Sequence, residues 1–308
     1  MSIDLVNNDK QQLNHILVEL LRTLDEVCQR YNIKYFVFAG TMLGAIRHKG
    51  IIPWDDDVDV VLWREDYNRL MQAADEGAFQ PPFFFQNPNT DPGYPKGYCR
   101  LRNSNTTEIP IVDVYEKCNH GIFIDIFPLD NIPDEEVAFS KQIRKLKRMR
   151  NLMNVYARHH AGIGTLGASA AQSLAYHAVA MLFKTKILSM KSLYGKYESI
   201  ATRYSNSRTK RVGTIAGLFD NQRFIFARGP WESKPIRLDF EDIKVPVPES
   251  YDEILKHSYG DYLTPKQERT NHGETFFSAT IPYEKYIEDN KHVLLEKRYK
   301  LTNGGKKK

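Results

Sequence analysis

The chain has 308 residues, of which 42% are hydrophobic and 26% charged; these are ordinary globular values that exclude wholesale disorder and a multi-span membrane protein. Its net charge of +5 is concentrated in one segment, because residues 141–150 hold six cations and no acid. Such local basicity argues against a protein that coats nucleic acid along its length, so we expect no nucleic-acid partner.

Helices and strands alternate in the first half of the chain, according to the sequence pattern. Apolar residues recur at three- and four-residue spacing from Leu13 to Cys28, which is typical of an amphipathic helix. Aromatic and β-branched runs predict strands. In order, we expect a strand at 34–39, a helix at 42–48, a strand at 57–62, a helix at 65–74 and strands at 83–85, 98–102 and 122–127.

The second half opens with a helical pattern over residues 134–204, in which one face is apolar and another is cationic. Within it, the uncharged window 161–183 has the length of a membrane span, but its glycines and polar side chains favour a packed helix over a spanning or membrane-lying one. Short strands at 224–227 and 236–247 and a helix at 251–259 follow. The whole pattern predicts an α+β fold with a mixed sheet.

Three scattered cysteines, Cys28, Cys99 and Cys118, include no Cys-x-x-Cys pair. They predict neither a disulfide framework nor a cysteine zinc site. The first residues also lack the charged and then apolar layout of a secretion signal. We therefore expect a cytoplasmic protein.

The strongest chemical signal lies in the strand at 57–62 and just before it. Alternate side chains of a strand share a face, so Asp57 and Asp59 project together while Val58 and Val60 point into the core. Two adjacent carboxylates repel each other, and a cation held between them removes that repulsion. Oxygen ligands favour Mg²⁺ or Mn²⁺. Asp55 is a further candidate ligand at the same strand edge.

An anion site is predicted just upstream of these acids. The strand at 34–39 ends in Gly40 and Thr41, and the free backbone N–H groups at the start of the next helix attract phosphate. Arg47 adds positive charge nearby. A phosphate site beside a carboxylate-held metal is what phosphoryl or nucleotidyl transfer requires, because that chemistry depends on positioning and charge neutralisation.

The residues of this region resemble the signature of a known protein family. The segment GTMLGAIRHKGIIPWDDDVDV resembles the signature of the LicD/fukutin-related family, within the nucleotidyltransferase-fold superfamily, in which a later strand supplies a third carboxylate. Asp125 in GIFIDIFPLD matches that position, and CRLRNSNT resembles a basic motif with Arg102 at its arginine. The stretch from Tyr259 to His272 resembles the closing motif of the family. The matches are patchy and leave residues 161–190 uncovered.

The resemblance implies transfer of a phospho-alcohol from a CDP-activated donor to a hydroxyl of a cell-surface glycan or its lipid-linked precursor, with CDP-choline as the expected donor. We expect the metal and catalytic residues to be Asp57, Asp59 and Asp125, with Asp55 as a further metal ligand. We expect Asp125 either to complete the metal shell or to take the proton of the acceptor. The expected substrate contacts are Gly40, Thr41, Arg47, Arg102 and His272.

The resemblance also implies how the chain is divided. We expect a nucleotidyltransferase-like core at 1–133, a helical insertion at 134–205 and a C-terminal part at 206–308 that completes the catalytic domain. The cationic helix face and the uncharged window predict a peripheral contact of the insertion with an anionic membrane or with a lipid-linked acceptor.

Two alternatives stay open at this level. A nucleotidyltransferase that moves NMP would use the same carboxylates and the same metal, so the core motif does not separate the two reactions. A non-catalytic glycan- or lipid-binding relative would keep the fold, although the presence of all three expected carboxylates disfavours it. The donor alcohol, the acceptor sugar and the oligomeric state are not determined by the sequence.

Overall fold

The computed structural model describes residues 7–114, 116–162, 170–184, 188–266 and 275–296. In chain order the elements are α1 (Asn7–Arg30), β1 (Phe36–Val37), α2 (Ala39–Arg47), β2 (Asp59–Trp63), α3 (Arg64–Asp75), β3 (Phe83–Gln86), β4 (Cys99–Asn103), β5 (Thr107–Pro110), β6 (Ile122–Ile132), α4 (Glu136–His160), α5 (Ala170–Lys184), α6 (Met190–Ala201), η1 (Thr202–Tyr204), β7 (Arg211–Gly213), α7 (Ile215–Leu218), η2 (Gln222–Phe224), β8 (Ile225–Ala227), α8 (Arg228–Trp231), β9 (Pro235–Phe240), β10 (Ile243–Pro248), α9 (Tyr251–Tyr259), β11 (Thr275–Ser278) and α10 (Tyr283–Asp289).

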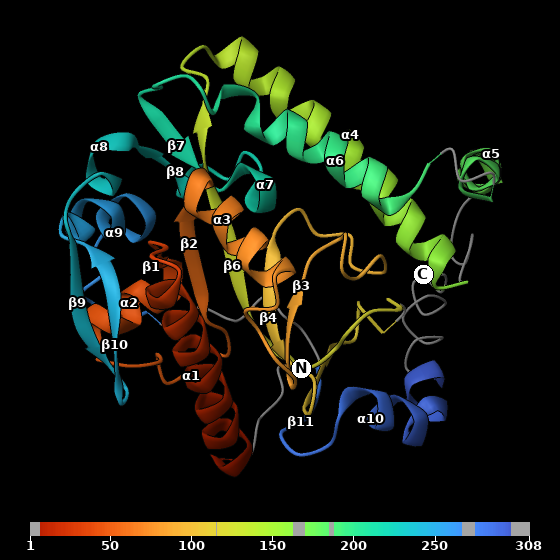
Figure 1. Ribbon diagram of the computed structural model, residues 1–308, viewed down its shortest axis with the longest axis horizontal. Coiled ribbons are helices and arrows are strands. Elements are labelled where there is room, and N and C mark those ends of the chain that lie inside the picture. Colours follow the sequence, from red (N-terminus) through yellow and green to blue (C-terminus); the bar gives the residue numbers. More distant parts are fainter. Residues whose placement is uncertain (1–6, 115, 163–169, 185–187, 267–274, 297–308) are drawn as a thin grey trace.

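A mixed seven-stranded sheet lies at the centre of the molecule (Figure 1). Its strand order is β1-β2-β6-β4-β3, and β7 pairs with the end of β6 and with β8. Strands β2 and β6 run parallel, whereas the other neighbours are antiparallel. This register places Asp59 of β2 directly beside Asp125 of β6. The sheet thus joins two acidic residues that lie far apart in the sequence.

The central strands are strongly apolar because helices cover the sheet. Helices α1 and α3 lie across one face of it in Figure 1. The apolar stripe of α1 predicts this contact, since its side chains at three- and four-residue spacing are buried in the main core. Leu17, Leu20, Leu21 and Leu24 are completely inaccessible to solvent.

A second hydrophobic cluster holds the helical middle of the chain. Helices α4 and α6 pack side by side (Figure 1) and bury Leu146 and Tyr197 among other side chains. A buried ionic network connects this cluster to the sheet, because Arg64, the first residue of α3, donates to Asp130 of β6 and to Glu198 of α6 at 2.6–2.7 Å. The position of α6 relative to the central strands is therefore fixed by charge as well as by packing.

The predicted α+β fold with a mixed sheet is confirmed. Each helix and strand expected in the first half is present, with shifted ends. The strand expected at 34–39 is reduced to two residues because Ala39 adopts a φ of +48° and begins α2. The segment 236–247 folds as the hairpin β9–β10. Strands β5, β7 and β11 were not predicted, since three or four residues are too few to show a periodic pattern.

Residues 163–169 of the uncharged window lie outside the described residues, and residues 170–183 belong to α5. Phe183 of α5 packs against Tyr156 of α4, with their ring centroids 5.0 Å apart. Among the described helices, none combines the length and the apolar character needed to cross a membrane. The division into a core, an insertion and a completing C-terminal part stays a prediction.

Candidate active site

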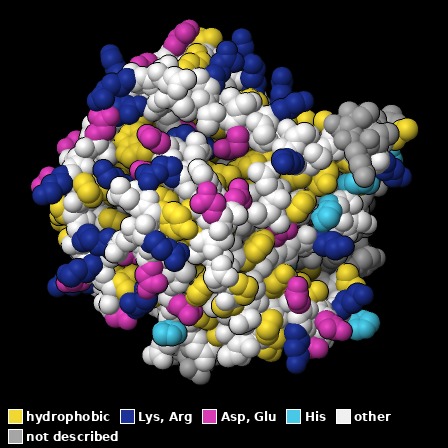
Figure 2. All heavy atoms as spheres, viewed as in Figure 1, with side chains coloured by type: hydrophobic (Ala, Val, Ile, Leu, Met, Phe, Trp, Pro, Cys, Tyr) yellow, Lys and Arg dark blue, Asp and Glu magenta, His cyan; other side chains and the backbone are white. Residues whose placement is uncertain are grey.

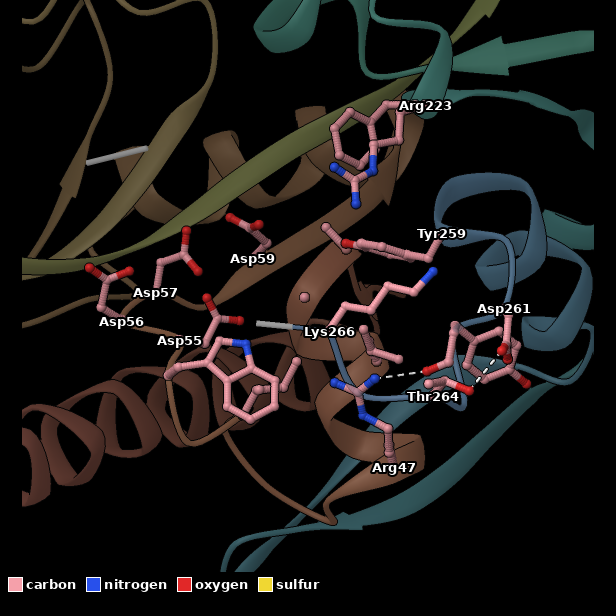
Figure 3. A pocket seen from close by; sticks show the side chains of 17 residues that line it. Arg47, Asp55, Asp56, Asp57, Asp59, Arg223, Tyr259, Asp261, Thr264 and Lys266 are labelled. Carbon is pink, nitrogen blue, oxygen red and sulfur yellow. Dashed lines mark hydrogen bonds between the residues drawn. The ribbon is translucent and has the colours of Figure 1, made fainter. Parts of the chain in front are cut away.

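A cavity of about 270 Å³ opens between α2, the segment before β2, η2 and the segment that follows α9 (Figure 3). Five of the predicted site residues line it: Gly40, Arg47, Asp55, Asp57 and Asp59. In Figure 3 the side chains of Asp55, Asp56, Asp57 and Asp59 lie on one side of the cavity. Those of Arg47, Arg223 and Lys266 lie on the other side, together with Asp261. The cavity is therefore divided into an acidic side, residues 55–59, and a cationic side formed by Arg47, Arg223 and Lys266.

The acidic side concentrates negative charge in a small volume. Carboxylate oxygens of Asp55, Asp56 and Asp57 all lie within 4.8 Å of one another. Burial raises the pKa of the Asp57 carboxyl well above its ordinary value, and the neighbouring carboxylates of Asp59 and Asp55 raise it further. A cluster that offers only oxygen ligands at such spacing fits a hard divalent cation, which would relieve this repulsion.

Lys10, near the start of α1, supplies a positive charge behind the acidic side. Its ammonium group donates to the backbone carbonyl of Asp55. Burial lowers the pKa of Lys10, while the carboxylates of Asp56 and Asp55 raise it. Lys10 thus lies within the electrostatic field of these carboxylates.

Asp59 and Asp125 are held by backbone hydrogen bonds on either side of the β2–β6 junction. The N–H of Asp59 donates to the Thr41 hydroxyl at 2.8 Å, and the N–H of Asp125 donates to the carbonyl of Val58 at 2.9 Å. The Asp125 carboxylate accepts a hydrogen bond from Nε of Arg100 at 2.6 Å. Asp125 is thus adjacent to Asp59 and close enough to Asp57 to act on its pKa, and it forms an ion pair with Arg100.

Gly40 and Thr41 are arranged differently from a simple phosphate cradle. Gly40 lies in the first turn of α2, and a Cβ atom there would come within 2.6 Å of a carboxylate oxygen of Asp55. The glycine therefore permits the close approach of Asp55 to the positive start of the helix. Thr41 is buried, with 4% of its surface exposed, and its hydroxyl accepts from Asp59. Its visible function is to fix the start of β2.

The cationic side is assembled from segments that are distant in the sequence. Nη1 of Arg47 donates to the carbonyl of Tyr262 at 2.8 Å. Nε of Arg223 donates to the carbonyl of Ser258 at 2.9 Å, and its guanidinium lies 4.3 Å from the centre of the Tyr259 ring. These contacts hold both arginines against the end of α9, from where they face the carboxylates (Figure 3).

Thr41 and Arg102, two of the predicted substrate contacts, do not line this cavity, and neither does the predicted metal ligand Asp125. The side chain of Arg102 is buried and donates to Gln86 and to the carbonyl of Gly121, both at 2.5 Å. The arginine that reaches the acidic group is Arg100, which the register of β4 and β6 sets opposite Asp125. His272 lies outside the described residues.

Four residues of the site were missed by sequence reasoning. Asp56 belongs to the same acidic run and could have been included on that signal. Arg100 lies two positions before Arg102 on the same strand face, where spacing alone gives no reason to prefer either. Arg223 and Lys266 carry no local signal, because only the folded chain brings them to the acids.

The fold and the site define an α+β domain whose mixed sheet sets an acidic run at the start of one strand beside an aspartate of the neighbouring strand. Residues 32–151 match the family model described as LicD/FKTN/FKRP, nucleotidyltransferase domain. The chain is 25% identical over 268 residues to the lipopolysaccharide cholinephosphotransferase LicD of Haemophilus influenzae, which covers 85% of this chain and 94% of that protein.

Shorter similarities point in the same direction. An uncharacterized protein of Rickettsia prowazekii is 33% identical over 135 residues, 44% of this chain and 46% of that protein. The human ribitol 5-phosphate transferase FKRP is 39% identical over 56 residues, 18% of this chain and 11% of that protein. The family-model match over residues 32–151 and these similarities support the LicD/fukutin-related family.

Proposed function

We propose that this protein is a metal-dependent transferase that moves phosphocholine from CDP-choline to a hydroxyl of a cell-surface glycan or its lipid-linked precursor. The observation that carries the proposal is the division of the cavity into an acidic and a cationic side. A nucleoside diphosphate donor with a divalent ion needs both, since the carboxylates bind the ion and the cations bind the diphosphate. The 25% identity with a cholinephosphotransferase over most of the chain supports this donor class.

In this proposal the acidic side of the cavity binds the metal ion and the cationic side binds the diphosphate. Asp57, Asp59 and Asp55 would hold Mg²⁺ or Mn²⁺, and the ion when bound neutralises the donor oxygens and the leaving CMP. Arg47 and Arg223 would orient the diphosphate from the opposite side. The reaction also requires that the acceptor hydroxyl lose its proton.

Asp125 lies beside Asp59 and is oriented by Arg100. In this proposal it accepts the proton of the acceptor hydroxyl. Attack of that hydroxyl oxygen on the phosphorus next to choline forms the new ester bond and breaks the bond to CMP. Charge is balanced when the proton leaves to Asp125 and the bond electrons leave with CMP.

Aromatic side chains at the cavity are consistent with a choline donor. Trp54, Tyr259 and Tyr262 line it together with the charged groups. A quaternary ammonium binds well to aromatic faces, whereas a polyol such as ribitol needs hydrogen-bond partners instead. The choice of choline over ribitol rests on this feature and on the similarity to LicD.

The experiment offers labelled CDP-choline, CDP-ribitol and nucleoside triphosphates to the protein with Mg²⁺ and measures CMP release and label transfer. We expect CMP release from CDP-choline, and its loss in Asp59→Asn but not in Asp289→Asn, an exposed acid on α10. Transfer of NMP from a triphosphate would overturn the proposal in favour of a nucleotidyltransferase. Absence of both activities and of Mg²⁺ binding would favour a non-catalytic relative.

We also propose that the insertion contacts an anionic membrane surface at the inner face of the membrane. Exposed Lys141, Arg144 and Arg148 lie along α4, and Figure 2 shows dark blue side chains along the edge of the molecule where α4 runs. Such a face attracts anionic lipid by roughly 1 kcal/mol for each cation near the surface.

Vesicle sedimentation tests this contact. The wild type should bind phosphatidylglycerol vesicles at low salt and should not bind phosphatidylcholine vesicles. Replacing all three α4 cations by glutamine should weaken the binding, whereas replacing exposed Lys285 and Lys291 should not. Equal binding by all three proteins would refute a contact through α4.

A further inference from the structure

A second cavity, of about 360 Å³, lies between the loop before β4 and the middle of α4. Its polar lining consists of Lys96, Glu116, Arg150, Asn154 and Arg158. None of these residues lines the first cavity. The second cavity is therefore a separate chamber with its own charged groups.

Arg150 is the unusual member of this lining. It interacts with the hydroxyl of Tyr197, but its Nε and Nη1 atoms are buried and have no hydrogen-bond partner among the described residues. Within the same described part of the chain, neither Arg150 nor Lys96 has a carboxylate within 4.0 Å. Buried guanidinium groups are normally paired, because an unmade charged hydrogen bond costs free energy. The two nitrogens are therefore available for an acceptor from outside the chain.

The charge balance of the cavity indicates the kind of acceptor. Three cations line it against a single carboxylate, that of Glu116. Burial and the nearby carboxylate of Asp113 raise the pKa of Glu116 to about 7, although Lys96, Arg100 and Arg150 act in the opposite direction. The cavity is thus positive near neutral pH whether or not Glu116 carries a proton, and it favours an anion with several oxygen acceptors.

The second cavity is linked to Asp125 through Arg100. Arg100, which holds Asp125 at 2.6 Å, is also close enough to Glu116 to lower its pKa. Burial and the carboxylate of Asp125 raise the pKa of the Tyr98 hydroxyl, and Arg100 and Arg150 lower it. Arg100 therefore connects the charge of the second cavity with the carboxylate that we assign to the acceptor hydroxyl.

We propose that the Arg150 cavity binds an oxyanion, a phosphate or a carboxylate, carried by the acceptor glycan. Binding there would orient the acceptor so that its reacting hydroxyl faces Asp125. The acceptor role rests on the proposed transferase function, whereas the binding of an oxyanion by Arg150 does not.

Calorimetric titration with three sugars tests the proposal. Glucose 6-phosphate and glucuronate carry the two candidate oxyanions, and glucose carries neither. We expect at least one charged sugar to bind about tenfold or more tightly than glucose, and Arg150→Met to remove that difference, because a charged hydrogen-bond donor is lost. Arg208→Met, which removes an exposed arginine paired with Glu232, should change nothing.

Several outcomes would overturn the proposal. Equal affinity for all three sugars would do so, and so would unchanged binding in Arg150→Met. Loss of binding in Lys266→Met would also count against it, since that result would place the sugar phosphate in the first cavity. If Arg150→Met does not fold, Lys96→Met at the same cavity replaces it. Failure of the transferase proposal shows separately, as an absence of CMP release from CDP-choline by the wild type.

Discussion

The two sides of the first cavity are built in different ways. The acidic side comes from residues 55–59, so its carboxylates are adjacent because the chain is continuous. The cationic side comes from Arg47, Arg223 and Lys266, which meet only when α2, η2 and the segment after α9 pack together. Local sequence therefore imposes charge repulsion on one side, and tertiary structure supplies the compensating charge on the other.

The largest effect expected on this comparison comes from Asp57→Asn. Activity should fall about 1,000-fold or more, because a metal ligand at the reacting diphosphate is lost. The metal-free protein should become more stable, by about 1–3 kcal/mol, since burial and the neighbouring carboxylates make the charged form of Asp57 costly. Activity assays and chemical denaturation without metal measure the two effects.

The diagnostic result for Asp57→Asn is a loss of activity together with a gain in stability. Asp289→Asn, on the exposed surface of α10, is the matched control and should alter neither quantity. A variant of Asp57 that loses stability and activity together would indicate that the acidic side serves the fold and not a bound cation.

The cationic side should be less sensitive. Arg223→Met should lower kcat/KM for the donor about 10- to 100-fold, the range expected when a charged contact to a phosphate is removed. Lys266→Met should act in the same direction. Lys285→Met, on exposed α10, is the control. If both variants of the cationic side keep wild-type kcat/KM, the diphosphate is bound elsewhere, and the assignment of diphosphate binding to the cationic side is wrong.

The difference between the two sides also explains what the sequence could reveal. Asp55, Asp57 and Asp59 could be predicted because they are neighbours in one motif. Asp125 was predicted because it matches the third carboxylate of the resembled family, and the register of β2 and β6 sets it beside Asp59. Arg223 could not be predicted, since its position at the cavity depends on η2 packing against α9.

Other differences between the predicted and the observed site come from the register of the strands. Arg100 and Arg102 share one face of β4, and only the pairing with β6 sets Arg100 opposite Asp125 and Arg102 opposite Phe123. Gly40 was predicted to contact a phosphate, and the group that approaches it in the structure is the carboxylate of Asp55. Periodicity thus predicted the elements and their faces, and it could not predict which pairs of side chains meet across them.

Thr41→Val should have a smaller effect, through the support of the acidic side. Valine keeps the shape of the buried side chain but leaves the N–H of Asp59 without its hydroxyl acceptor. We expect a loss of about 1–3 kcal/mol in the free energy of unfolding. Thr41→Ser keeps the hydroxyl and should recover most of it. If valine and serine are equally stable, the hydrogen bond does not hold the start of β2.

The smallest expected effect is the stabilisation of the protein by Mg²⁺, and it distinguishes the acidic side of the first cavity from the cationic side. A cation that binds only the folded protein stabilises it by about 1.4 kcal/mol at ten times its dissociation constant. Mg²⁺ should therefore raise the unfolding temperature of the wild type and leave that of Asp57→Asn unchanged. Arg223→Met should keep the full response, because its guanidinium faces the carboxylates from the opposite side of the cavity. If Arg223→Met loses the Mg²⁺ response while Asp57→Asn keeps it, the assignment of metal to one side and diphosphate to the other is wrong.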